Sequence, residues 1–158
     1  MSPNRPSDSP RYRALLQLLQ TADTIWNASH AFFAGWELSP SQFNVLNLLQ
    51  LHPDGLSQTD LSRHLITHRS NVTGLVDRLE KRALVQRQDA AADRRAYRVR
   101  LTPAGAKLMA EILPRYYAGA EELWAPLSDR RANQLIDDLE QVTERAQRIA
   151  AQLNQPTR

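Results

Sequence analysis

The sequence predicts a mainly α fold with a small β-hairpin, in the α+β class. Apolar residues recur at three-four spacing over long stretches, two short helices are joined by a tight turn, and Tyr97–Leu101 alternates apolar and basic residues. The 158 residues are enough for one domain of ordinary size. We therefore expect a disordered Pro- and Ser-rich tail over 1–10 and a single domain over 11–158.

Two helices are expected before residue 52. Apolar residues from Leu15 to Trp36 fall at three-four spacing, which predicts a long amphipathic helix over 11–36. Ser39-Pro40 then supplies an N-cap and a proline at the first helical position. The turn at residues 52–55, His-Pro-Asp-Gly, ends this second helix.

A winged helix-turn-helix is expected over 39–101. Ser57, with Asp60 three residues later, is typical of a capping box that opens a short helix. A further helix, over 69–82, carries one apolar face, formed by Val72, Leu75, Val76 and Leu79. Residues 83–88 predict a strand, 89–95 a polar loop, and Tyr97–Leu101 a second, half-solvated strand.

Two more helices should complete the chain. Thr102-Pro103 caps and begins a long helix, in which Pro114 predicts a kink, and Ser128 caps the last helix. Apolar residues of that last helix repeat at four-three spacing, the pattern of helices that pair: Leu135, Leu139, Val142, Ala146, Ile149 and Leu153.

The net charge of +3 hides an uneven distribution. The window 57–107 holds 11 basic and 5 acidic residues, a net +6, so the rest of the chain carries −3. A basic window of this kind favours a polyanion as partner, although a charged cluster is also compatible with a solvated surface.

The absence of cysteine excludes disulfides, thiol catalysis and thiol redox sensing. No apolar run has the length of a membrane span, so we expect a cytoplasmic protein without a membrane partner.

The outward face of the 69–82 helix suits a major groove because its residues are small: Ser70, Asn71, Thr73 and Gly74. Asn71 can pair with adenine, and Thr73 can meet a thymine methyl group. Gly74 fits either close approach to DNA or packing against a neighbouring helix. Four basic residues of this helix suit phosphates, or are solvated surface charges: Arg69, Arg78, Lys81 and Arg82.

The segment Asp93-Arg94-Arg95 is the candidate minor-groove contact. An arginine on a hairpin can enter a narrow minor groove, where the potential is more negative, and Asp93 could orient it. The alternative is a surface salt bridge without function. Three arginines of the strands could flank the same groove: Arg87, Arg98 and Arg100.

Four segments together resemble the MarR family: 56–61 (LSQTDL), 70–82 (SNVTGLVDRLEKR), 93–96 (DRRA) and 99–105 (VRLTPAG). The resemblance covers about residues 11–153. It implies an obligate-type homodimeric bacterial transcription regulator that dimerises through 11–36 and 103–153, with the helix from Arg69 in the major groove, Arg95 in the minor groove and Asp93 holding it. Two positions depart from the family. At Thr67-His68 either residue could cap the recognition helix. Ala83 replaces a glycine, so the turn from this helix into the strand should be tighter or strained.

Regulators of the resembled family often bind small aromatic or lipophilic effectors between the DNA-binding lobes and the dimer stem. Trp26, His30 and Trp36 could line such a pocket, or they belong to the core and the dimer interface. No catalytic constellation is evident, so we expect no enzyme, no cofactor and no metal; His64 and His68 are separated by the predicted turn.

The sequence therefore predicts a regulator that binds a pseudo-palindromic double-stranded operator on the nucleoid, a repressor relieved by a small effector. The alternative is a helix-mediated protein-interaction module that acts on another regulator. The basic hairpin disfavours this alternative.

Overall fold

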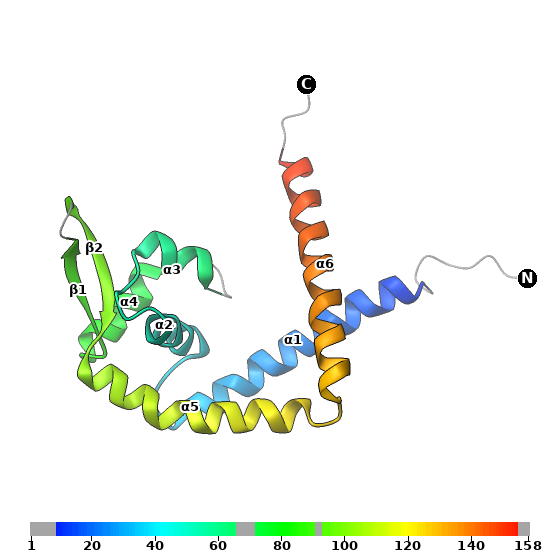
Figure 1. The fold of residues 1–158 in the computed structure, drawn as a ribbon, viewed down its shortest axis with the longest axis horizontal. Coiled ribbons are helices and arrows are strands. Elements are labelled where there is room, and N and C mark those ends of the chain that lie inside the picture. Colours follow the sequence, from blue (N-terminus) through cyan, green and yellow to red (C-terminus); the bar gives the residue numbers. More distant parts are fainter. Residues whose placement is uncertain (1–8, 66–71, 91–92, 155–158) are drawn as a thin grey trace, which may run out of the picture. The chain divides into compact units, whose positions relative to one another are not determined.

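The computed structural model describes residues 9–65, 72–90 and 93–154, and at 89–90 and 93–96 it describes the backbone alone. Six helices and a two-stranded hairpin follow one another in this part of the chain (Figure 1): α1 (Pro10–Ala34), α2 (Pro40–Leu51), α3 (Gln58–His64), α4 (Val72–Lys81), β1 (Val85–Ala90), β2 (Asp93–Leu101), α5 (Pro103–Trp124) and α6 (Asp129–Leu153). The predicted mainly α fold with a β-hairpin is confirmed. The chain divides after Ala110 into two compact units, 1–110 and 111–158.

The second helix begins as its sequence predicts, whereas α1 differs slightly from the range expected. It begins at Pro10, one residue earlier than expected, and ends at Ala34, two residues earlier. At the start of α2, the Ser39 hydroxyl accepts from the Gln42 amide (3.2 Å), and the Gln42 side chain accepts from the Ser39 amide (2.8 Å). This reciprocal capping box, with Pro40 at the next position, fixes the start of α2.

The turn after α2 depends on glycine. Gly55 has φ +76°, and a Cβ atom there would lie 2.6 Å from the main-chain oxygen of Val99. This close approach lets Leu56 form a short bridge with Val99 of β2, with N–O distances of 3.0 and 2.8 Å. The chain before α3 is thereby attached to the hairpin.

The core of the first unit lies where α2, α3, α4 and the hairpin meet. Its fully buried side chains come from each of these elements and from the first part of α5: Phe43, Val45, Leu46 and Leu49 of α2, Leu61 of α3, Val76 and Leu79 of α4, Val85 of β1, Val99 of β2 and Met109 of α5. The predicted apolar face of α4 is confirmed, since Val72 and Leu75 are buried too. Burial of these side chains is the main force that holds α4 against α2 and α3.

The hairpin is longer than the sequence predicts. Residues 89–95 were expected to form a loop, but β1 runs to Ala90 and β2 begins at Asp93. The strands are antiparallel, from Val85 opposite Leu101 to Asp89 opposite Tyr97, and then Ala90 pairs with Asp93 across a bulge. At 89–90 and 93–95 the loop prediction was wrong, because the ladder continues through this bulge into the polar segment; residues 91–92 lie outside the described part.

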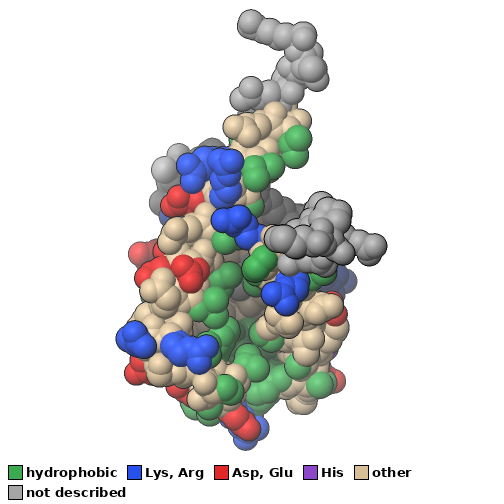
Figure 2. All heavy atoms as spheres, turned by 90° about the vertical axis from the view of Figure 1, so that its right-hand side faces the viewer, with side chains coloured by type: hydrophobic (Ala, Val, Ile, Leu, Met, Phe, Trp, Pro, Cys, Tyr) green, Lys and Arg blue, Asp and Glu red, His purple; other side chains and the backbone are tan. Residues whose placement is uncertain are grey.

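The second unit comprises the end of α5 and all of α6. α5 continues through Pro114, and α6 begins after Ser128, whose side chain makes no capping hydrogen bond. α6 has no buried residue, and Ile136, Val142, Ile149 and Leu153 are exposed. Figure 2 likewise shows hydrophobic side chains at the surface among charged ones. The apolar face of α6 is therefore exposed from Val142 onward in the single chain, while Leu135 and Leu139 are half-buried.

Candidate nucleic-acid interface

Three of the residues predicted to contact DNA lie in the described part of α4. Thr73 and Arg78 of α4 are exposed and Gly74 is half-buried, while the apolar face of the same helix is buried. Arg69, Ser70 and Asn71, and the candidate cap residues Thr67 and His68, lie outside the described residues. Asp93, Arg94 and Arg95 lie in β2 by their backbone, and their side chains are outside the described part as well.

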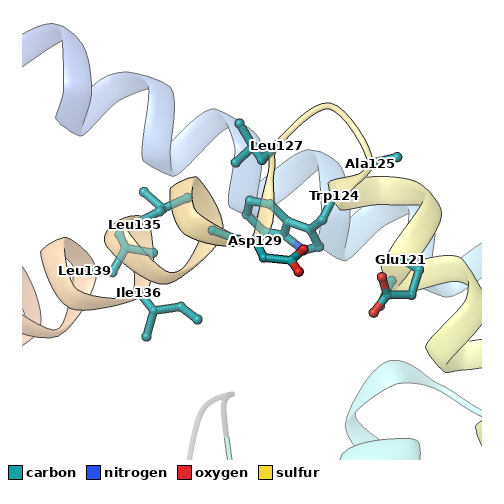
Figure 3. Close-up of a pocket in the computed structure, with 10 residues that line it drawn as sticks. Glu121, Trp124, Ala125, Leu127, Asp129, Leu135, Ile136 and Leu139 are labelled. Atoms are coloured by element: carbon teal, nitrogen blue, oxygen red, sulfur yellow. The ribbon is translucent and has the colours of Figure 1, made fainter.

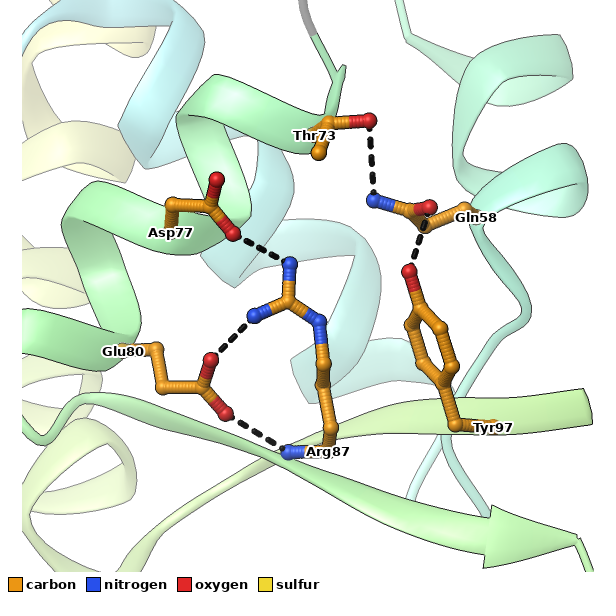
Figure 4. Close-up of polar contacts among 6 residues, drawn as sticks. All are labelled: Gln58, Thr73, Asp77, Glu80, Arg87 and Tyr97. Atoms are coloured by element: carbon orange, nitrogen blue, oxygen red, sulfur yellow. Dashed lines mark hydrogen bonds and ion pairs between the residues drawn. The ribbon is translucent and has the colours of Figure 1, made fainter.

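Arg87 of β1 anchors the hairpin to α4. Its guanidinium pairs with Asp77 (2.5 Å) and with Glu80, and its main-chain amide donates to Glu80 Oε1 at 3.1 Å (Figure 4). The Arg87 side chain is 23% exposed and lies 5.3 Å from the ring centre of Tyr97 in β2. Arg87 thus connects both strands with one face of α4.

A second chain of hydrogen bonds joins the hairpin to α3. The Tyr97 hydroxyl donates to Gln58 Oε1 (2.5 Å), and Gln58 Nε2 donates to Thr73 Oγ1 (3.2 Å). Figure 4 shows the side chain of Gln58 lying between Thr73 and Tyr97. These bonds hold β2, α3 and the first turn of α4 in one arrangement, so the hairpin and α4 can meet a ligand as one surface.

Hydrogen bonds also shift the pKa values of Arg87 and Asp60. Burial acts to lower the pKa of Arg87, but its bonds to Asp77, Tyr97 and Glu80 outweigh burial and raise that pKa. At the start of α3, the Ser57 hydroxyl donates to Asp60 Oδ2 (2.6 Å) and lowers the pKa of Asp60, with Arg63 and Arg98 contributing in the same direction. Both groups are therefore held in their charged forms.

The predicted capping box at Ser57 takes a different form. The Ser57 hydroxyl accepts from the Asp60 amide (3.1 Å), as an N-cap should. The Asp60 carboxylate, however, accepts from the Ser57 hydroxyl. It bonds the cap side chain because the shorter aspartate replaces the glutamate that normally reaches back to the N-cap amide.

Several arginines predicted to contact DNA have partners inside the protein. Arg87 is held by α4, and Arg98 and Arg100 donate to the main-chain oxygens of Gly55 (3.2 Å) and Asp54 (3.0 Å). Arg82 donates to main-chain oxygens at the end of α1. Charge alone suggested phosphate contacts. The partners inside the protein could not be predicted, because they lie more than 40 positions away in the sequence for Arg82, Arg98 and Arg100. Arg78 and Lys81 are exposed and form no ion pair with another described residue.

The turn from α4 into β1 is strained, as the alanine at its centre predicts. Ala83 has φ +55°, in the left-handed region that favours glycine. The Leu84 amide donates to the Leu79 oxygen (3.0 Å) and the Ala83 amide to the Glu80 oxygen (2.8 Å), which is a Schellman motif. The bonds that end α4 therefore hold Ala83 in this conformation.

The candidate effector residues fall into two groups on the chain. Trp26 and His30, one turn apart on α1, make an edge-to-face contact with ring centres 5.8 Å apart. Trp36 lies beyond the end of α1 and contacts Phe32, with ring centres 5.5 Å apart. The described structure brings Trp26 and His30 together, and it gives Trp36 a separate aromatic neighbour.

A cavity of about 620 Å³ lies in the second unit, between the end of α5 and the start of α6 (Figure 3). Its walls are mainly apolar and include Trp124, Leu127, Leu135 and Leu139, with Glu121 and Asp129 at its polar part. The spacing of Leu135 and Leu139 predicted that the last helix pairs with another helix, but not that a cavity lies beside it. The signal was present, since Trp124 and Leu127 flank the turn that precedes the last helix.

No group of three His, Asp or Glu side chains in the described ranges is placed to hold a metal ion. His64 lies beside His52, with ring centres 6.4 Å apart and near-parallel planes, and His68 is outside the described residues. No described helix is long and apolar enough to cross a bilayer.

The paired helices α3 and α4 with the anchored hairpin define a winged helix-turn-helix protein. Residues 36–96 match the sequence model of the MarR family. The chain is 34% identical over 88 residues to the transcriptional repressor MprA of Escherichia coli strain K12, a match that covers 56% of this chain and 48% of that protein. The chain thus spans about half the length of this relative.

Two solved structures extend the likeness over most of the chain. A MarR family transcriptional regulator from Silicibacter pomeroyi DSS is 26% identical, with a TM-score of 0.75 and coverage of 90% of this chain and 97% of that one. CouR from Rhodococcus jostii RHA1, bound to p-coumaroyl-CoA, is 25% identical, with a TM-score of 0.72 and coverage of 80% and 88%. The chain is thus similar to the MarR family in sequence over residues 36–96, and similar in fold to a MarR family regulator over most of its length.

Proposed function

We propose that this protein is a homodimeric transcription regulator that binds double-stranded DNA at a pseudo-palindromic operator and represses until a small effector is bound. The observation that carries the proposal is the attachment of the hairpin to α4 through Arg87, Asp77 and Glu80. A hairpin fixed to the recognition helix can contact a minor groove while the helix lies in the adjacent major groove. A freely moving hairpin would lose that register.

Residue roles follow from this arrangement. Thr73 and Gly74, with Ser70 and Asn71, would meet base edges, and Arg69 and Arg78 would meet phosphates. Arg95, with its neighbour Arg94, would enter the minor groove, and Asp93 would orient it. Support comes from the exposure of Thr73 and Arg78 on the face of α4 opposite the core, and from the repressor activity named for MprA.

Dimerisation would involve helices 11–36 and 103–153. The support is the apolar surface of the single chain: in α1 Leu15 and Leu19 are 51% and 58% exposed, and α6 has no buried side chain. A second copy covering these faces would remove apolar area from water. Two-fold symmetry would then set half-sites about 10 bp apart, or a multiple of that spacing.

The effector would be small and aromatic or lipophilic. The support is the contact between Trp26 and His30, which combines an aromatic surface with one polar group, and the acyl-CoA bound in the CouR structure. An effector that prefers one spacing of the two recognition helices would shift the protein to that spacing and alter DNA affinity.

Selection of bound fragments from genomic DNA, followed by footprinting on the recovered duplexes, tests the proposal. We expect a protected, pseudo-palindromic site and an affinity that falls steeply with salt, because phosphate contacts release counterions. Recovery of no specific fragment would contradict the proposal. An association with another regulator that is insensitive to salt would favour the protein-interaction module instead.

A further inference from the structure

Residues 82–84, which follow α4, form hydrogen bonds with the segment after α1 and with the start of α5. Arg82, at the end of α4, donates from Nη1 to the main-chain oxygen of Glu37 (2.6 Å) and from Nη2 to that of Trp36 (3.0 Å). We infer that Arg82 is a positioning residue, which fixes the direction of α4 relative to α1 and thereby sets DNA affinity without contacting DNA. The inference rests on the proposed DNA-binding function.

The chemistry of Arg82 suits the end of α1. Trp36 and Glu37 directly follow Gly35, the C-cap of α1, so their oxygens lie next to the negative end of the helix dipole, where a cation is favoured. A guanidinium presents donors in a rigid fork that can reach two adjacent oxygens at once, which a lysine ammonium does not reproduce. The Glu37 carboxylate, 3.9 Å from Nη2, adds opposite charge at the same place.

The two residues after Arg82 are held by the start of α5. The Thr102 hydroxyl donates to the Ala83 oxygen (2.6 Å), and the Thr102 amide donates to the Leu84 oxygen (3.1 Å). Gly105 permits this contact, because a Cβ atom there would lie 2.1 Å from the Leu84 oxygen. Residues 82–84 therefore contact the end of α1 and the start of α5, and both helices belong to the proposed dimer stem.

Backbone strain is concentrated at the same junction. Glu37 (φ +53°) and Ala83 (φ +55°) are the non-glycine residues with positive φ in the described ranges. Each follows a helix that ends in a Schellman motif: the Leu38 amide bonds the Phe33 oxygen after α1, as the Leu84 amide bonds the Leu79 oxygen after α4. Arg82 joins these two strained helix ends, so a displacement of α1 is transmitted directly to the end of α4.

A direct phosphate contact would use Arg82 differently. The Arg82 side chain is 33% exposed, but two of its nitrogens are already bonded to carbonyl oxygens, so a phosphate would have to compete with these bonds. Lys81, the preceding residue, is exposed and pairs with no described residue, so it is a matched control for loss of one positive charge.

The experiment compares the wild type with Arg82→Ala, Arg82→Lys and Lys81→Ala. The full-length proteins are titrated with a duplex recovered from genomic selection, over a range of salt concentrations. We expect both Arg82 variants to bind about tenfold more weakly with the salt slope unchanged. Amide exchange should rise at residues 36–38 in both Arg82 variants and stay at the wild-type level in Lys81→Ala.

A phosphate contact would give the opposite pattern. Arg82→Lys would then retain wild-type affinity, and Arg82→Ala would lower the salt slope by about one, with exchange at residues 36–38 unchanged. That result would overturn the inference. Failure of the wild-type protein to bind DNA would overturn the proposed function instead, and the exchange measurement would still decide whether Arg82 links α4 to α1.

Discussion

Arg87 of β1 and Asp77 of α4 are joined by an ion pair of 2.5 Å, ten positions apart in the sequence. With Glu80 as the second carboxylate, this pair fastens the hairpin to the helix proposed to lie in the major groove. The position of the hairpin is thus a property of the folded lobe.

Replacing Arg87 with alanine should destabilise the protein and weaken DNA binding. The change leaves Asp77 and Glu80 facing each other without their cation, and we expect a loss of about 1–2 kcal/mol because both carboxylates are partly solvated. Urea unfolding measures this loss. Arg78→Ala, on the same helix but exposed, should change stability by less than about 0.5 kcal/mol. Equal losses in the two variants would contradict the anchoring role.

Ala83→Gly should stabilise the protein. A left-handed backbone costs a residue with a Cβ atom roughly 1 kcal/mol, and glycine removes that cost at φ +55°. We expect a gain somewhat below this value, since glycine also makes the unfolded chain more flexible. Thermal or urea unfolding provides the measurement. Ala106→Gly, inside α5 with helical backbone, should lose about 1 kcal/mol, and a loss at both positions would refute the strain at Ala83.

The stability of the α3 start should depend on pH. The Ser57 hydroxyl lowers the pKa of Asp60 below its ordinary value of 3.8, so the folded state favours the charged carboxylate. The charged Asp60 therefore stabilises the folded protein fully at pH values above 3.8, and this stabilisation is lost as the pH falls through the lowered pKa of the folded state. Urea unfolding of wild type and Asp60→Asn should therefore differ at neutral pH and converge in acid. In a Ser57→Ala background the pH-dependent difference should shrink, and persistence of the full difference would contradict the assignment.

The helices were predictable because their signals are local, whereas the partners of the arginines were not. Capping by Ser39 and Ser57 and the apolar face of α4 can be read from neighbouring residues. Arg82, in contrast, bonds to oxygens 45 and 46 positions earlier, and Arg98 bonds to Gly55, 43 positions away. Sequence shows the charge of these residues, but only the tertiary fold decides which oxygens they reach.

In the hairpin and in the segment Thr102-Pro103-Ala104-Gly105, local features were likewise predictable and tertiary contacts were not. Alternation predicted the strands but not the bulge, because a bulge depends on pairing between strands. The cap at Thr102 was predicted, and the structure adds the reason for Gly105, whose missing Cβ lets α5 approach the Leu84 oxygen. The side chains of Arg69 and Arg95 lie outside the described residues, so their roles stay predictions.

Arg95→Ala should weaken operator binding without lowering the melting temperature. The proposed role is insertion into a minor groove, where an arginine gains from the negative potential, and this role requires no contribution to folding stability. Fluorescence anisotropy at fixed salt and thermal unfolding together measure the two effects. Arg148→Ala, an exposed arginine on α6, removes the same charge far along the chain and should leave affinity unchanged. Wild-type affinity in Arg95→Ala would reject the minor-groove assignment.

A single charge on the apolar face of α6 should disrupt the proposed dimer. Val142 is 56% exposed in the single chain, so Val142→Glu should leave the monomer fold intact, yet it would bury an unpaired carboxylate in an interface between two copies. Sedimentation at several concentrations should show dissociation at concentrations at least about tenfold higher than for wild type. Gln141→Glu adds the same charge at an adjacent position that lies off the apolar stripe, and should remain dimeric. If both variants dimerise like the wild type while circular dichroism shows unchanged helix content, the dimer does not use this face, and the exposed residues of α6 require a different partner.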